Sequence, residues 1–145
     1  MAVKDLYDTD FLEWTARNAE LLRAGRLEEA DLEHIAEEIE DMGKCQRHEL
    51  RSRLRVLLIH MIKWQHQPDK RGPSWIRTID TQRAEIADLL RDAPSLRALI
   101  EESLPDVYQQ AARQAARETG TDRKALATSC PFTAEQTLDS DFYPQ

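Results

Sequence analysis

Apolar residues recur every three or four positions along this chain, and no stretch alternates apolar and polar residues as a half-buried strand does. This spacing is typical of amphipathic α-helices. A first helix is expected to start at a capping residue between positions 8 and 10 and to end at Gly25. The residues expected on its inward side are Phe11, Trp14 and Leu21.

A second apolar stripe begins after Asp31, a suitable N-cap residue, and continues toward Pro68. The sequence fits either one long kinked helix or two helices hinged at Gly43, and in both cases the helical pattern ends before Pro68. The inward stripe is expected to consist of Leu32, Ile35, Ile39, Met42, Leu50, Leu54, Leu57, Met61 and Trp64.

The rest of the pattern predicts three more helices, separated by segments that contain proline and glycine. They are expected from Ser74 to near Asp92, from Pro94 to Gly120 with a kink or a new segment at Pro105, and, after the capping-box pair Thr133 and Gln136, through Leu138. The expected fold is all-α, an antiparallel helical bundle of about four to six helices with a long or kinked second-to-third helix. Residues 1–120 are expected to form one bundle domain, and residues 121–145 a C-terminal tail that packs back on it with one short helix.

Charge is distributed unevenly over the 145 residues, whose formal net charge is -7. Residues 1–42 contain 13 acids and 4 bases, whereas residues 43–92 contain 11 bases and 6 acids. Helices of opposite charge that pack side by side in one domain account for this division as well as an external partner does. The negative total argues against a general nucleic-acid-binding protein, because phosphate binding depends mainly on Lys and Arg.

The compartment follows from segments that the sequence lacks. The N-terminus has no apolar signal core, and the longest apolar run, residues 56–62, is far too short to span a membrane. Cys45 and Cys130 lie far apart without a CxxC motif, as expected for thiols in a reducing compartment. We therefore expect a cytoplasmic protein without a membrane segment.

Four polar residues fall on the apolar side of the predicted helices: Glu38, Arg53, His60 and Arg83. Buried arginines need a carboxylate, and Glu38 is the acid placed to supply it. One interpretation is a buried ion-pair and hydrogen-bond network that fixes helix register. The alternative is a polar pocket for a small anion or a metal, in which Glu38 and His60 would be the ligands.

The sequence offers little for metal binding or catalysis. Di-metal sites in helical bundles use Glu-x-x-His pairs, and this chain has none. It also lacks the nucleophile-elbow, P-loop and Rossmann glycine motifs. We therefore predict no catalytic residue and no cofactor, and interpret the chain as non-enzymatic.

A basic stripe on the long second-to-third helix is formed by Arg47, Arg51 and Arg55 together with Lys44 and His48. Nucleic acid could lie along such a stripe. A solvated face that balances the acidic residues before Gly43 is the commoner explanation, because no aromatic residues or base-reading motifs accompany it.

Several short motifs, in a fixed order, run through nearly the whole chain. They are Tyr7-x-x-Asp10-Phe11-x-x-Trp14, Leu22-Arg23-x-Gly25, Glu37-Glu38-Ile39, Leu57-Leu58-x-His60-x-x-Lys63-Trp64, Ser74-Trp75-x-x-Thr78-Ile79, Gln82-Arg83, Pro94-Ser95-Leu96 and Cys130-Pro131-Phe132-Thr133. Together they resemble the bacterial family called domain of unknown function 29. The resemblance implies a small all-helical protein without an established activity, and it supplies no catalytic residues.

The function that these observations favour is a small helical interaction module that binds a protein partner or associates with itself. Two alternatives stay open: an anion or metal site at Glu38, His60 and Arg83, and nucleic-acid binding through Arg47, Arg51 and Arg55.

Overall fold

The computed structural model describes residues 2–145, which are all-helical, as the apolar periodicity predicts. The α-helices are α1 (Val3–Thr9), α2 (Phe11–Arg23), α3 (Leu32–His66), α4 (Pro73–Asp92), α5 (Leu96–Thr119) and α6 (Ala134–Leu138). Two short 3-10 helices occupy Pro68–Lys70 and Arg123–Ala125. The backbone contacts divide the chain into an N-terminal unit that ends at Gln46 and a C-terminal unit from Arg47 to Gln145. This division falls inside the range 1–120, and α3 contributes residues to both units.

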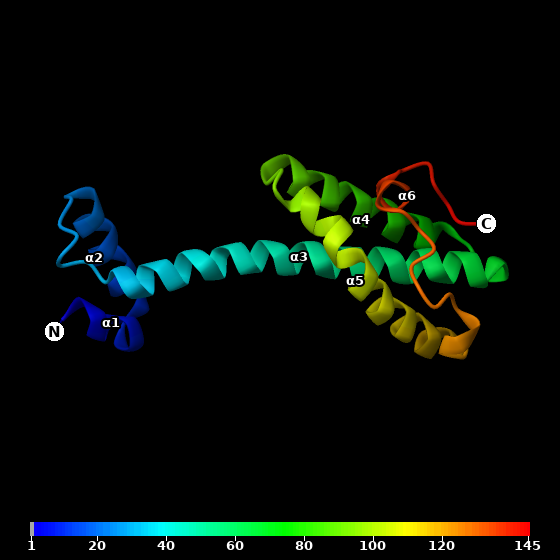
Figure 1. The fold of residues 1–145 in the computed structure, drawn as a ribbon, viewed down its shortest axis with the longest axis horizontal. Coiled ribbons are helices and arrows are strands. Elements are labelled where there is room, and N and C mark those ends of the chain that lie inside the picture. Colours follow the sequence, from blue (N-terminus) through cyan, green and yellow to red (C-terminus); the bar gives the residue numbers. More distant parts are fainter. Residues whose placement is uncertain (1) are drawn as a thin grey trace. The chain divides into compact units, whose positions relative to one another are not determined.

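The N-terminal unit consists of α1, α2 and the first part of α3 (Figure 1). Asp10 caps α2, since its carboxylate accepts a 3.1 Å hydrogen bond from the backbone N–H of Glu13. The turn after α2 uses Gly25 at φ +73°, a conformation that glycine adopts without a steric penalty. Asp10 and Gly25 therefore act as the start and stop signals that the sequence predicts, whereas α1 precedes the first predicted helix and Ser74, expected as a cap, lies inside α4, which begins at Pro73.

The long helix α3 runs without interruption through Gly43. A glycine inside a helix costs about 1 kcal/mol relative to alanine, which is not enough to break a helix of this length. Of the two alternatives that the sequence leaves open, a single long helix is the one observed.

The apolar stripe of α3 is buried only in its second half. Leu50, Leu54 and Leu57 are inaccessible to solvent, whereas Ile39 is 62% and Met42 69% exposed. Leu32 on α3 and Phe11 on α2 are also exposed, so the prediction that these four residues face inward is wrong. A helix has an apolar side wherever its sequence repeats, but burial requires another element to cover that side.

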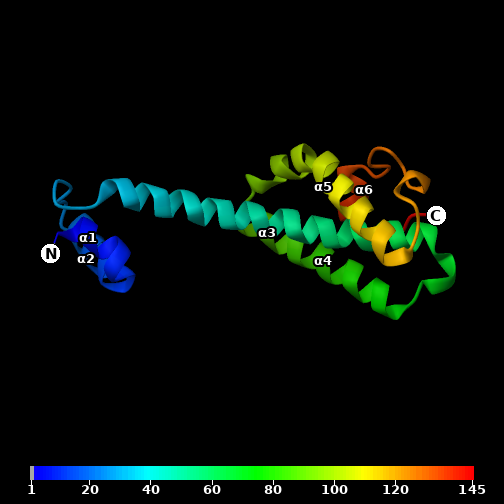
Figure 2. The same ribbon diagram turned by 90° about the horizontal axis from the view of Figure 1, so that it is seen from below.

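The C-terminal unit contains the main hydrophobic core. Figures 1 and 2 both show α4 and α5 beside the C-terminal half of α3, with α6 next to them. The core joins buried residues from these helices, among them Leu57, Met61, Ile79, Ile86, Ile100, Val107, Ala111 and Ala115. The alanines of α5 allow close packing because they carry only a methyl group.

The last 25 residues are anchored to this core by Leu126 and Phe132, both of which are buried. Thr133 and Gln136 form the predicted capping box at the start of α6, with hydrogen bonds of 3.0 and 3.1 Å. Tyr143 packs its ring 4.9 Å from that of Trp64 on α3. Among the described residues, none of the helices combines the length and the apolarity that a bilayer span requires.

Candidate functional site

The four polar residues predicted to face inward have separate sets of partners. Glu38 belongs to the N-terminal unit and bonds to Tyr7, while Arg53, His60 and Arg83 belong to the C-terminal unit. Glu38 is not the carboxylate that satisfies Arg83, whose hydrogen bonds go to two backbone carbonyls and to the sulfur of Met61. The four residues therefore do not form one hydrogen-bonded network.

Glu38 accepts a 2.5 Å hydrogen bond from the hydroxyl of Tyr7. This bond, with burial and the negative charge of Glu38, raises the pKa of Tyr7 to about 12. The Tyr7 ring also stacks on His34, with 3.9 Å between ring centroids. The hydrogen bond between Tyr7 and Glu38 thus connects α1 to α3.

Asp31 is the centre of a second polar cluster that the sequence indicates only as a helix cap. It is 1% exposed, and its carboxylate contacts Trp14 Nε1 at 3.0 Å and His34 Nδ1 at 2.6 Å. Asn18 accepts a 2.8 Å hydrogen bond from the Asp31 backbone N–H. Burial acts to raise the pKa of Asp31, but the hydrogen bonds from Trp14 and His34 outweigh it and lower that pKa. The i,i+4 pair Trp14 and Asn18 is the sequence signal that could have located this cluster.

Arg53 and His60 are held by neighbours on their own or the adjacent helix. Arg53 pairs with Glu49 at 3.2 Å and with Glu85 at 3.7 Å. The Nδ1 of His60 lies 2.8 Å from the carbonyl oxygen of Val56, one turn earlier. Burial lowers the pKa of His60, so the neutral imidazole is favoured and Nδ1–H is the donor to this carbonyl.

Within residues 2–145, no three His, Cys, Asp or Glu side chains are grouped closely enough to hold a metal ion. His60 and Glu38, the two ligands considered from the sequence, each bond to a neighbour in their own unit. The arrangement therefore gives no support to a metal centre built on these two residues.

Arg83 is the most unusual of the predicted residues, because it is a buried cation whose bonds go to neutral groups. It is 4% exposed, and it donates through Nε to the carbonyl of Thr137 at 2.9 Å and through Nη2 to that of Gln136 at 3.3 Å. Its guanidinium lies 5.5 Å from the ring centroid of Tyr143. Burial lowers its pKa, although arginine stays protonated in proteins.

One nitrogen of this guanidinium, Nη1, is buried and has no hydrogen-bond partner in the described part of the chain. Asp80 and Asp139 are near enough to act on the pKa of Arg83, but neither forms an ion pair with it among the described residues. The guanidinium therefore retains an unused donor, and its positive charge is balanced only in part, by Asp80 and Asp139 acting without a direct ion pair.

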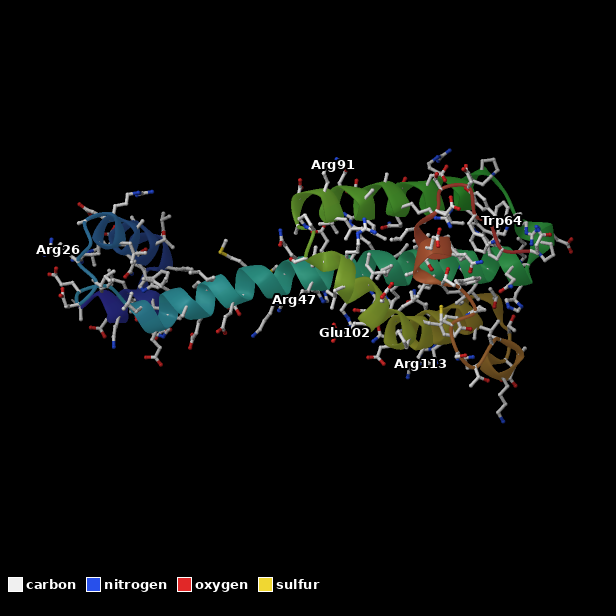
Figure 3. The ribbon with its side chains drawn as sticks, turned by 45° about the horizontal axis from the view of Figure 1, so that its top comes forward. Arg26, Arg47, Trp64, Arg91, Glu102 and Arg113 are labelled. Atoms are coloured by element: carbon white, nitrogen blue, oxygen red, sulfur yellow. The ribbon has the colours of Figure 1, made fainter. Side chains whose placement is uncertain are left out.

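Arg83 also lines a pocket of about 380 Å³ in the C-terminal unit. The other residues that line it are Ile86, Ala87, Leu90 and Arg91 of α4, Arg97 of α5 and Leu138 of α6. Three of the seven lining residues are arginines and none is acidic. Arg91, labelled in Figure 3, is paired with Asp88 at 2.8 Å.

The basic stripe of α3 continues onto α5. Arg55 lines a shallow pocket with Arg113 and Arg117, and Figure 3 labels Arg47 on α3 and Arg113 on α5. Arg47 is exposed, whereas Arg51 and Arg55 are partly buried. Aromatic side chains do not line this pocket, in agreement with the absence of a base-stacking pattern in the sequence.

The family model described as "Domain of unknown function DUF29" matches residues 6–143. No curated protein and no solved structure matches the sequence. The family match confirms the resemblance that rests on the ordered motifs from Tyr7 to Thr133.

Proposed function

The chain belongs to the DUF29 family, and we propose that it is a helical interaction module that pairs with a second copy of itself. The observation that carries this proposal is the position of its exposed apolar residues. Seven of the eight large apolar residues exposed among the described positions lie in the N-terminal unit: Phe11, Leu12, Leu22, Leu27, Leu32, Ile39 and Met42.

Three of these residues lie on one side of α3, and we name them the α3 stripe: Leu32, Ile39 and Met42. Leu32 and Ile39 are seven residues apart, which is two helical turns, and Met42 follows one turn later on the same side. Such spacing is that of a helix that packs against another helix. Exposed apolar side chains that cluster in this way mark an interaction surface.

The distribution of charge along α3 favours a second copy of this chain as the partner that covers the α3 stripe. The half before Gly43 carries Glu33, Glu37, Glu38, Glu40 and Asp41. The half after it carries Lys44, Arg47, Arg51, Arg53 and Arg55, with a single acid among them, Glu49, which pairs with Arg53. Two α3 helices that pair antiparallel place each acidic half opposite a basic half. A parallel pair would place like charges opposite one another, which is unfavourable.

Light scattering after size exclusion, at concentrations from micromolar to near millimolar, tests the proposal. We expect a concentration-dependent dimer that becomes monomeric in the double variant Ile39→Glu, Met42→Glu. The control is Ile76→Glu, which replaces an exposed apolar residue of α4 by the same acidic residue and should leave the dimer intact. A monomeric wild-type chain over this whole range, or equal loss of the dimer in the control, would contradict it.

A location in the cytoplasm fits this proposal. Cys45 and Cys130 are both free thiols, and Cys45 is exposed beside the α3 stripe. Exposed thiols of this kind persist in reducing compartments.

A second candidate function is nucleic-acid binding by the basic surface made of Arg47, Arg51, Arg55, Arg113 and Arg117. The observation that favours it is the pocket in which Arg55 of α3 meets two arginines of α5. It predicts an affinity for single-stranded oligonucleotides that falls with salt and with the change Arg113→Glu. Equal affinity for the Arg113→Glu variant and the wild-type chain would exclude it.

A further inference from the structure

The pocket beside Arg83 has the features of a ligand site, and it lies within the C-terminal unit, independent of the self-association proposed above. Its volume, about 380 Å³, is within the range of small-molecule pockets. The lining combines an apolar part, Ile86, Leu90 and Leu138, with the arginines. A site of this composition suits a small molecule that is apolar over most of its body and charged at one end.

The environment of Arg83 indicates that the charged end of this ligand is negative. A buried guanidinium without a carboxylate is costly, and a buried donor without an acceptor adds to that cost. The carbonyls of Thr137 and Gln136 use Nε and Nη2, which leaves Nη1 without an acceptor in the described chain. An anion bound beside Arg83 would supply an acceptor and a direct charged partner, which Asp80 and Asp139 do not provide because neither forms an ion pair with Arg83.

Arg97 is the second cation available to such an anion. It is exposed and forms no side-chain hydrogen bond or ion pair within residues 2–145, although it also lines an adjacent pocket with Glu101, Glu135 and Asp139. Arg91 differs, because its guanidinium already pairs with Asp88. Arg97 is therefore free to turn toward a ligand, whereas Arg91 is in part neutralised.

We propose that this pocket binds a small organic monocarboxylate, with the carboxylate between Arg83 and Arg97 and the apolar body against Ile86, Leu90 and Leu138. The planar guanidinium groups match the two oxygens of a carboxylate. One negative charge is sufficient to balance Arg83, and the apolar walls provide no partners for the further oxygens of a phosphate.

The proposal is tested by titrating the full-length, isotope-labelled protein with sodium hexanoate at constant ionic strength and following backbone amide NMR signals. We expect saturable shifts centred on residues 83–97 and 134–139. 1-Hexanol, which has the same chain length without the charge, and inorganic phosphate, which has charge without the chain, should each bind at least about tenfold more weakly.

The change Arg97→Gln removes one cation without disturbing the core and should weaken hexanoate binding about tenfold or more. Arg77→Gln is the matched control, since Arg77 is an exposed arginine of α4 that does not line the pocket. Absence of saturation at tens of millimolar hexanoate, shifts centred elsewhere, equal binding of phosphate, or equal affinities of the Arg97→Gln and Arg77→Gln variants would each overturn the proposal.

Discussion

The indole N–H of Trp14 donates a 3.0 Å hydrogen bond to the buried carboxylate of Asp31, across 17 residues of sequence. This contact joins α2 to the residue that immediately precedes α3. Because Asp31 also caps α3 and contacts His34, one carboxylate organises most of the N-terminal unit. The small unit thus depends on a polar centre, while many of its large apolar residues are exposed.

Replacing Trp14 by Phe should destabilise the N-terminal unit by about 1–3 kcal/mol, because the Asp31 carboxylate loses a buried donor while most of the aromatic packing is kept. Amide hydrogen exchange of residues 11–40 measures this change locally. Leu12→Gln, at an 81% exposed position of the same helix, is the control and should change little. Equal protection in both variants would show that the hydrogen bond does not hold the unit together.

The stability of the N-terminal unit should depend on pH through His34. The hydrogen bond to Asp31 raises the pKa of His34 above its ordinary value of 6.5. Its contribution is therefore complete below pH 6.5 and is lost as pH rises through the higher folded-state pKa. Hydrogen exchange of α2 between pH 5 and 9, corrected for the intrinsic rate, should show this loss. The variant His34→Gln should not.

The stability of the N-terminal unit at low pH should depend on Asp31. Its pKa is lowered from 3.8, so its contribution is present above that value and is lost as pH falls through the folded-state pKa. Circular dichroism during acid titration should reveal the transition, and Asp31→Asn should shift it. An unchanged acid transition in that variant would assign acid unfolding to other carboxylates.

The contribution of His60 to stability should depend on pH in the opposite direction to that of His34. Burial lowers the pKa of His60 below 6.5, which means that its neutral form is the one the folded state favours. The contribution of His60 to stability is complete above pH 6.5 and decreases as pH falls below it. The free energy of unfolding, measured in denaturant with a probe in the C-terminal unit, should therefore decrease between pH 7 and pH 5. The change His60→Gln should make this decrease smaller. An equal slope in both proteins would refute the assignment.

Reversal of one charge distinguishes the direction in which two α3 helices pair. If they pair antiparallel, Arg47 faces the acidic half of the partner, and Arg47→Glu should weaken association. In a parallel pair, Arg47 faces a basic half, and the same change should strengthen association. Sedimentation equilibrium shows whether Arg47→Glu weakens or strengthens the dimer. Measurements at low and high salt identify the effect as electrostatic, because it should become smaller as salt is added.

Local signals in the sequence were sufficient for every α-helix except α1, which precedes the first predicted helix, and for several helix ends. Asp10, Gly25 and the pair Thr133 and Gln136 act within a few residues of themselves, so their effect can be inferred without a fold. The inward position of Arg83 was also inferred correctly from its place between Ile79 and Ile86. Its partners were not, because Thr137 follows it by 54 residues and offers a backbone carbonyl, a group that every residue carries.

The sequence by itself determined that this protein is all-helical, that its family is DUF29 and that α3 changes charge near Gly43. These properties depend on neighbouring residues and on their order along the chain. Only the tertiary structure decided that Leu57 is buried while Ile39, on the same stripe, is exposed. It also decided that Asp31 and Arg83 each lie at the centre of a polar cluster. Periodicity places a side chain on one side of a helix, but its burial and its partners depend on which distant segments pack there.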